Sequence, residues 1–107
     1  MTLSESEYDQ RAQPELRALI EAIDALDSEA LEAELSSDIL SLEFSDGSKY
    51  VVNSHRAARQ IWMAAISTAW HFDPVDGGGW RASKSGDELR STIARLVKER
   101  VGLDLSF

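Results

Sequence analysis

The strongest local signal in the chain is a β-hairpin near its centre. Residues 39–44 alternate apolar with polar side chains, as expected for a strand that buries one face. Asp46-Gly47 follows, and glycine takes a positive φ without steric cost, which favours a tight turn. Residues 49–53 then bring tyrosine and two valines, which are strand formers. The hairpin therefore predicts an antiparallel sheet at the centre of the chain.

A segment with helical periodicity precedes the hairpin. Ser4 and Glu7 have the spacing of a capping box, and apolar residues follow at three- and four-residue intervals. Pro14 interrupts the pattern, because proline lacks the N–H that an interior helical residue donates. We expect a kinked helix rather than a late start, since a kink keeps the early apolar residues on one stripe. That stripe comprises Tyr8, Ala12, Leu16, Leu19, Ile20, Ile23 and Leu26.

A second helix is predicted near the carboxyl end. Ser85 and Glu88 repeat the capping-box spacing, and Gly102 is a plausible C-terminal stop. The apolar stripe of this helix comprises Leu89, Ile93, Leu96, Val97 and Val101.

The remaining segments are short. Residues 28–35 are ambiguous, because glutamate, alanine and leucine favour helix whereas their alternation favours strand. We expect a polar loop at 54–59, a glycine-rich turn at 76–79 and further short strands at 60–65, at 70–73 and from Trp80. The order helix, strands, helix predicts an α+β two-layer sandwich. Both helices would cover one face of the antiparallel sheet and leave the other face open to solvent.

Length and composition limit what such a fold does. A chain of 107 residues with 43% hydrophobic residues suits one domain, which we expect to span residues 1–107. It has no cysteine, which excludes disulfides, thiolate metal sites and cysteine nucleophiles. No signal-peptide pattern and no apolar run of membrane-spanning length is present, so we expect a soluble cytoplasmic protein.

The negative charge is concentrated in the first half of the chain. Residues 1–48 hold thirteen acidic and two basic residues, whereas residues 49–107 hold six acidic and nine basic ones. The overall formal charge is -8, which disfavours nucleic acid and anionic membranes as partners. An acidic half is typical of a surface that binds cations or a basic protein. The alternative is that the negative charge only keeps the protein soluble.

Catalytic motifs are absent from the sequence. There is no phosphate-binding loop, nucleophile elbow, zinc-protease motif or EF-hand loop. His71 and Asp73 would share one strand face, where such a pair binds a metal, moves a proton or is simply a surface pair. His55 lies in the predicted loop and receives no role.

Several separated motifs together resemble one family. These are the hairpin Leu42-x-Phe44-x-Asp46-Gly47-Ser48-Lys49-x-Val51-Val52-Asn53, then Gln60-Ile61-Trp62-Met63-Ala64, His71-Phe72-Asp73, Trp80, Gly86 and Leu89. Their order and spacing resemble the frataxin family in its bacterial, CyaY-type form, from Ser4 to about Val101. The resemblance implies six strands in the order α-β-β-β-β-β-β-α, with residues 28–35 as the first strand.

The resemblance also implies a function. Frataxins bind iron, Fe2+ or Fe3+, weakly at surface carboxylates that form an acidic ridge on the first helix and first strand. They also bind the cysteine desulfurase and the scaffold protein of iron–sulfur cluster assembly, as an iron-dependent regulator or an iron donor. The ridge here would comprise Asp9, Glu21, Asp24, Asp27, Glu29, Glu32 and Glu34. Partner contacts would involve Glu21, Asp24, Asn53, Gln60, Trp62 and His71.

Reasoning from the residues adds detail and leaves alternatives open. Carboxylates are hard ligands that suit iron, manganese, magnesium or calcium, so an exposed acidic ridge predicts a weak, hydrated site. Trp62 should point to the open face, because Ile61 and Met63 alternate with it and should face the helices. We expect a monomer without metal and no catalytic residue. The alternatives are a metal-independent interaction module acting on the desulfurase and, ranked lower, a ferroxidase.

Overall fold

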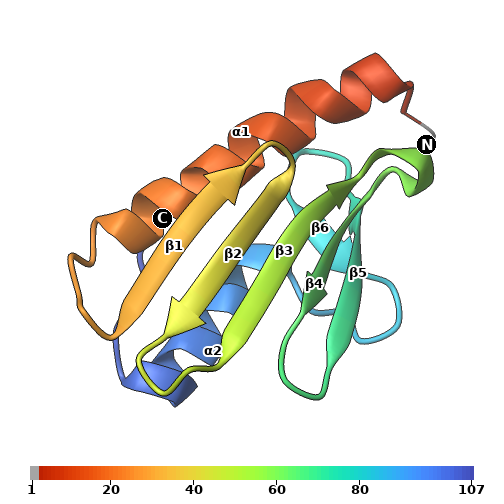
Figure 1. Ribbon diagram of the computed structural model, residues 1–107. Coiled ribbons are helices and arrows are strands. Elements are labelled where there is room, and N and C mark those ends of the chain that lie inside the picture. Colours follow the sequence, from red (N-terminus) through yellow and green to blue (C-terminus); the bar gives the residue numbers. More distant parts are fainter. Residues whose placement is uncertain (1–2) are drawn as a thin grey trace.

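The computed structural model of the protein describes residues 3–107. Two α-helices and six β-strands follow one another along the chain, with a short 3-10 helix between the third and fourth strands (Figure 1). Their bounds are α1 Glu5–Asp24, β1 Leu31–Ser36, β2 Ile39–Phe44, β3 Lys49–His55, η1 Arg56–Ala58, β4 Gln60–Ala64, β5 Ala69–Pro74, β6 Trp80–Ala82 and α2 Leu89–Val101. No helix among the described residues is long and apolar enough to cross a membrane.

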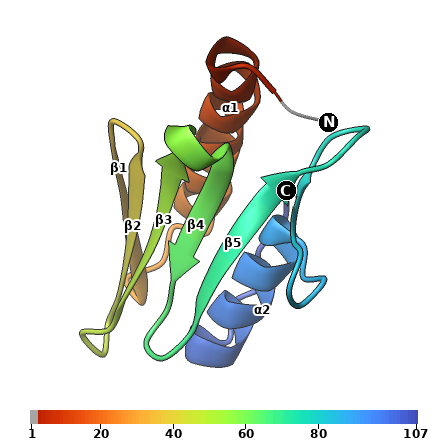
Figure 2. The ribbon, with the colours of Figure 1, turned by 90° about the vertical axis from the view of Figure 1, so that its right-hand side faces the viewer.

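The six strands form one antiparallel sheet in sequence order, β1 to β6. Both helices pack on the same side of it, and the other side is open (Figures 1 and 2). Between the layers lies an apolar core to which every strand contributes. The predicted two-layer α+β sandwich is therefore confirmed.

Helix α1 runs without interruption through Pro14. The Ser4–Glu7 capping box is present in both directions, at 3.0 and 3.1 Å. Tyr8 and Ala12, which precede the proline, are fully buried like the leucines that follow it. The prediction that the early residues belong to the helix is thus correct, and Pro14 itself lies exposed on the outer side.

Replacing Pro14 by alanine is expected to stabilise the protein. Proline costs about 3 kcal/mol relative to alanine inside a helix, and part of this is offset because proline also restricts the unfolded chain. We expect a gain of about 1–2 kcal/mol, measured by chemical denaturation, since the exposed site gives alanine nothing to clash with. An unchanged or lower free energy of unfolding would show that Pro14 does not destabilise the helix.

Strand β1 forms against local helix propensity. Each of its residues pairs with β2 in register, from Leu31 opposite Phe44 to Ser36 opposite Ile39. Leu31 is buried under the end of α1, while Glu32 and Glu34 point to the open side. Hydrogen bonding to the neighbouring strand and burial of one face outweigh the weak helical preference of these residues. Residues 28–30 remain outside the strand.

The predicted start of the second helix is wrong by three residues. Glu88, not Ser85, is the N-cap, and its carboxylate accepts from the amides of Arg90 and Ser91. The Ser85 hydroxyl instead accepts from the Asp87 amide in the preceding turn. A carboxylate at the N-cap suits the positive end of the helix dipole, which explains why glutamate caps here. Gly102 ends the helix at φ 72°, as predicted.

One ion pair connects the two helices. Glu15 of α1 is buried, and its carboxylate accepts two hydrogen bonds from the Arg90 guanidinium of α2, at 2.9 and 3.0 Å. This two-point contact gives the pair a fixed geometry. It links α1 to α2 on the covered side of the sheet.

Candidate functional site

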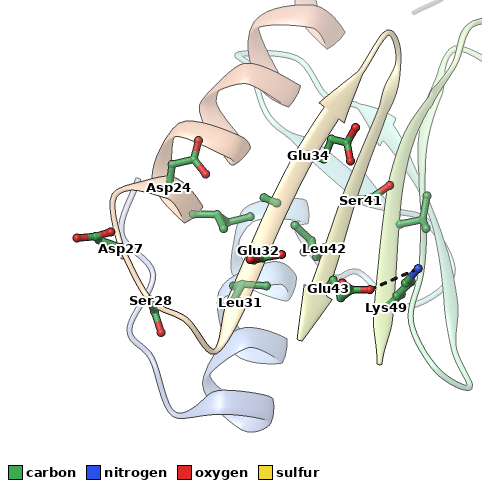
Figure 3. Close-up of a pocket in the computed structure, with 13 residues that line it drawn as sticks. Asp24, Asp27, Ser28, Leu31, Glu32, Glu34, Ser41, Leu42, Glu43 and Lys49 are labelled. Atoms are coloured by element: carbon green, nitrogen blue, oxygen red, sulfur yellow. Dashed lines mark ion pairs between the residues drawn. The ribbon is translucent and has the colours of Figure 1, made fainter. Parts of the chain in front are cut away.

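A hollow of about 730 Å³ follows the outer edge of the sheet, where the end of α1 meets β1 and β2. We call it the acidic groove, because five carboxylates line it against a single lysine, Lys49 (Figure 3). The loop after α1 ends at β1, so two elements separated by a turn bring their acids to one place. The five acids are Asp24, Asp27, Glu32, Glu34 and Glu43.

Two of these carboxylates oppose each other directly. Glu32 of β1 and Glu43 of β2 are cross-strand register partners on the open side of the sheet. Like charges in that arrangement are destabilising. At a separation of about 6 Å they repel by about 0.7 kcal/mol in water and by about four times as much near a protein surface. Lys49 relieves part of this by an exposed ion pair with Glu43, at 3.4 Å.

Other members of the predicted ridge lie apart from this pair. Asp9 is far along α1 and holds the Arg56 guanidinium through two hydrogen bonds of 2.6 and 3.1 Å, which raise the pKa of Arg56. Glu21 and Glu29 are exposed but do not line the acidic groove. Asp27 lines its rim, beyond the end of the helix, and its side chain points away from the strands (Figure 3).

The acidic groove is not a preformed metal cage. Within residues 3–107, no three acidic or histidine side chains stand close enough together to hold one metal ion. Its acids are exposed, so a cation would bind through one or two carboxylates and keep most of its water. The residues therefore suit hard divalent cations held weakly. Such binding would also offset the repulsion between Glu32 and Glu43.

The second notable surface lies at the centre of the open face. Trp62 of β4 is sandwiched between two imidazoles: His55 of β3 on one side and His71 of β5 on the other. The ring centroids are 3.8 and 4.3 Å apart and the rings are nearly parallel, at 16° and 12°. We call these three residues the indole stack. Parallel stacking at these distances packs the three rings closely against one another.

Hydrogen bonds fix the indole within its plane. The Trp62 Nε1 donates to Gln60 Oε1 at 2.7 Å, and Gln60 Nε2 donates to Asp73 Oδ1 at 2.9 Å. Asn53 is the cross-strand partner of Trp62 on β3 and His71 is its partner on β5. Asn53, Gln60, Trp62 and His71, predicted to meet a partner, are thus gathered on one face. Glu21 and Asp24 lie on α1, away from them.

The structure changes the expected environment of Trp62. It points to the open face as predicted, with Ile61 and Met63 buried beneath. It is not a lone exposed side chain, because His55 and His71 cover both faces of its ring and leave it half-buried. The predicted loop at 54–59 includes His55, yet β3 continues to this residue. His71 and Asp73 share the face, but Asp73 contacts Gln60 rather than the imidazole.

The fold and these two surfaces define a small α+β sandwich with a carboxylate-lined sheet edge and an aromatic patch on its uncovered face. A family profile described as "Frataxin-like domain" matches residues 1–103. The chain therefore belongs to the frataxin family.

Known relatives resemble the chain over nearly its whole length. A protein of Paraburkholderia phymatum named iron-sulfur cluster assembly protein CyaY is 36% identical over 100 residues, which is 94% of this chain and 93% of the relative. The CyaY protein of Ralstonia pickettii is 32% identical over 107 residues, covering 97% and 94% of the two chains.

Solved structures share the fold. The frataxin of Psychromonas ingrahamii superposes with a TM-score of 0.89 at 22% identity and covers 97% of both chains. A trimeric frataxin of the yeast Saccharomyces cerevisiae, crystallised with ferrous iron, gives 0.76 at 23% identity, with 96% and 90% covered.

Proposed function

We propose that the protein is an iron-responsive regulator of iron–sulfur cluster assembly that acts on a cysteine desulfurase and its scaffold protein. The proposal rests on family membership and on the name of its relatives, iron-sulfur cluster assembly protein CyaY. The structural observation that supports it most directly is the pairing of two separate surfaces on one rigid sheet. In this proposal the acidic groove binds a cation and the indole stack binds a partner protein.

The two surfaces suit different tasks. The exposed acids would bind ferrous iron weakly and reversibly, so occupancy would follow the iron concentration. Iron is here a cargo or signal rather than a resident cofactor. The indole stack provides a contact area of three packed rings with the large Trp62 indole at its centre, and large aromatic side chains are common at the core of protein interfaces. Iron in the acidic groove would reduce the negative charge beside this contact and so change how the complex assembles.

Two other functions are compatible with the fold. A metal-independent module would use the indole stack alone, with the acids docking on a basic partner surface. A ferroxidase would need two irons close together between bridging carboxylates. The exposed, spread acids of the groove do not favour that arrangement, so we propose a protein that is not itself an enzyme.

Desulfurase activity measured with and without iron separates these functions. Turnover of cysteine by purified desulfurase and scaffold would be followed anaerobically, with and without the protein, at zero and saturating ferrous iron. We expect the protein to change the rate, and the change to depend on iron. A rate change that is identical at both iron levels would support the metal-independent module instead. Protein-dependent oxygen consumption on adding ferrous iron to an aerobic sample would indicate the ferroxidase.

A further inference from the structure

A buried phenol connects α1 with the hairpin that carries the indole stack. Tyr8 is fully buried, and its hydroxyl lies 2.8 Å from Ser54 Oγ, 2.5 Å from the Gln60 carbonyl oxygen and 3.1 Å from the His55 amide nitrogen. A phenol has one proton to donate and two lone pairs to accept with. A carbonyl oxygen only accepts, so the proton goes to Gln60. Ser54 and His55 then both donate to the phenol oxygen, which satisfies it completely.

This hydroxyl occupies a particular place in the sheet. His55 and Gln60 are the last cross-strand pair of β3 and β4. The Tyr8 oxygen accepts from the amide of the first and donates to the carbonyl of the second, so it bridges two backbone groups of one pair. Beyond them the chain turns through η1 and through Arg59, which has a φ of 56°. The Tyr8 hydroxyl therefore closes the open end of the ladder.

The same pair of residues holds Trp62 on the opposite side of the sheet. The His55 ring stacks on the indole, and the Gln60 side chain accepts from its N–H. Burial raises the pKa of the Tyr8 phenol, which keeps its single donor in place. His55 and Gln60 thus both support the indole, and Tyr8 contacts the backbone of each.

We propose that Tyr8 is a positioning residue of the indole stack. From the helix side of the sheet, its hydroxyl sets the spacing of His55 and Gln60, and through them the orientation of Trp62 toward its partner. The effect on partner binding rests on the function proposed above. The effect on the geometry of the stack does not.

The experiment compares Tyr8→Phe with a matched control, Thr92→Val. Both remove one buried hydroxyl and keep the shape of the side chain, but the Thr92 hydroxyl on α2 donates to the Glu88 carbonyl of the same helix end rather than to β3 or β4. The first measurement is the NMR position of the Trp62 Nε1–H and the His55 ring protons. The second is the Kd for the purified desulfurase–scaffold complex.

For Tyr8→Phe we expect shifted Trp62 and His55 resonances and a Kd raised about two- to tenfold, the effect of losing hydrogen bonds of ordinary strength. Thr92→Val should change neither. Unmoved stack resonances in Tyr8→Phe would overturn the proposal, as would equal shifts in the control. Moved resonances with an unchanged Kd would also overturn its binding part, provided that Trp62→Ala does weaken the complex. If Trp62→Ala leaves the Kd unchanged, the partner does not bind through the indole stack. The NMR shifts alone then test whether Tyr8 positions the stack.

Discussion

Replacement of Trp62 by alanine is expected to weaken binding to the desulfurase–scaffold complex by about 30-fold or more. A large aromatic ring at the centre of an interface commonly contributes about 2 kcal/mol or more, which corresponds to that change in Kd. Here the loss would be larger than for an isolated ring, because His55 and His71 both lose their stacking partner. The measurement is the Kd of the complex by calorimetry, with the unfolding free energy recorded in parallel.

The matched control is Ile66→Ala. Within residues 3–107, Ile66 is the most exposed large apolar residue, at 61%, and it lies in the turn between β4 and β5, outside the stack. Its removal should leave the Kd within about twofold, because isolated surface contacts contribute little. An equal loss of affinity in both variants would show that the partner binds exposed apolar side chains in general. No loss in Trp62→Ala would place the partner contact elsewhere on the molecule.

Neutralising three acids of the groove is expected to have two opposite effects. The variant Glu32→Gln/Glu34→Gln/Glu43→Gln removes a direct like-charge pair, so without metal the protein should gain about 1 kcal/mol of stability. It should also lose about half of its stabilisation by iron. At an iron concentration of 100 times Kd the wild type gains about 2.7 kcal/mol, and a site weakened tenfold gains only about half of that. Thermal or chemical denaturation under anaerobic conditions measures both effects.

A second triple variant controls for the change in total charge. Asp76→Asn/Glu99→Gln/Asp104→Asn also removes three negative charges, but from exposed positions outside the groove. Its iron response should equal that of the wild type. If both triple variants lose the response equally, iron binding follows net charge rather than the acidic groove. If neither loses it, the metal binds at carboxylates outside the set Glu32, Glu34 and Glu43.

Much of the fold follows from short-range patterns in the sequence. The central hairpin is encoded by its alternation and by Asp46-Gly47, whose glycine has a φ of 89° in the structure. The Ser4–Glu7 cap and the buried stripe of α1 also follow from local rules. Strand β1 does not, because its residue types favour helix while their alternation favours strand, and pairing with β2 stabilises the strand. The family resemblance, and not local propensity, predicts this strand.

The candidate site was predictable in its residue types but not in its geometry. The acids of α1 and β1 were identified, yet their distribution depends on contacts that no spacing reveals. Asp9 is engaged by Arg56, 47 residues away. Glu43, by contrast, is expected from the strand order, and the register sets it opposite Glu32. The place of His55 does not follow from the sequence, because it requires β3 to extend two residues past its predicted end and the His55 ring to stack on Trp62 of β4.

The most direct test of this account is an anaerobic titration with ferrous iron followed by two-dimensional NMR of the backbone amides. Paramagnetic iron broadens the resonances of residues close to it. We expect broadening to begin at Asp24, Asp27, Glu32, Glu34 and Glu43 and to spread to Glu21, while the amides around Trp62 stay sharp. Uniform broadening, or no selective broadening at millimolar iron, would contradict an iron-binding role for the acidic groove. The acids would then be a docking surface, and regulation would act through the indole stack alone.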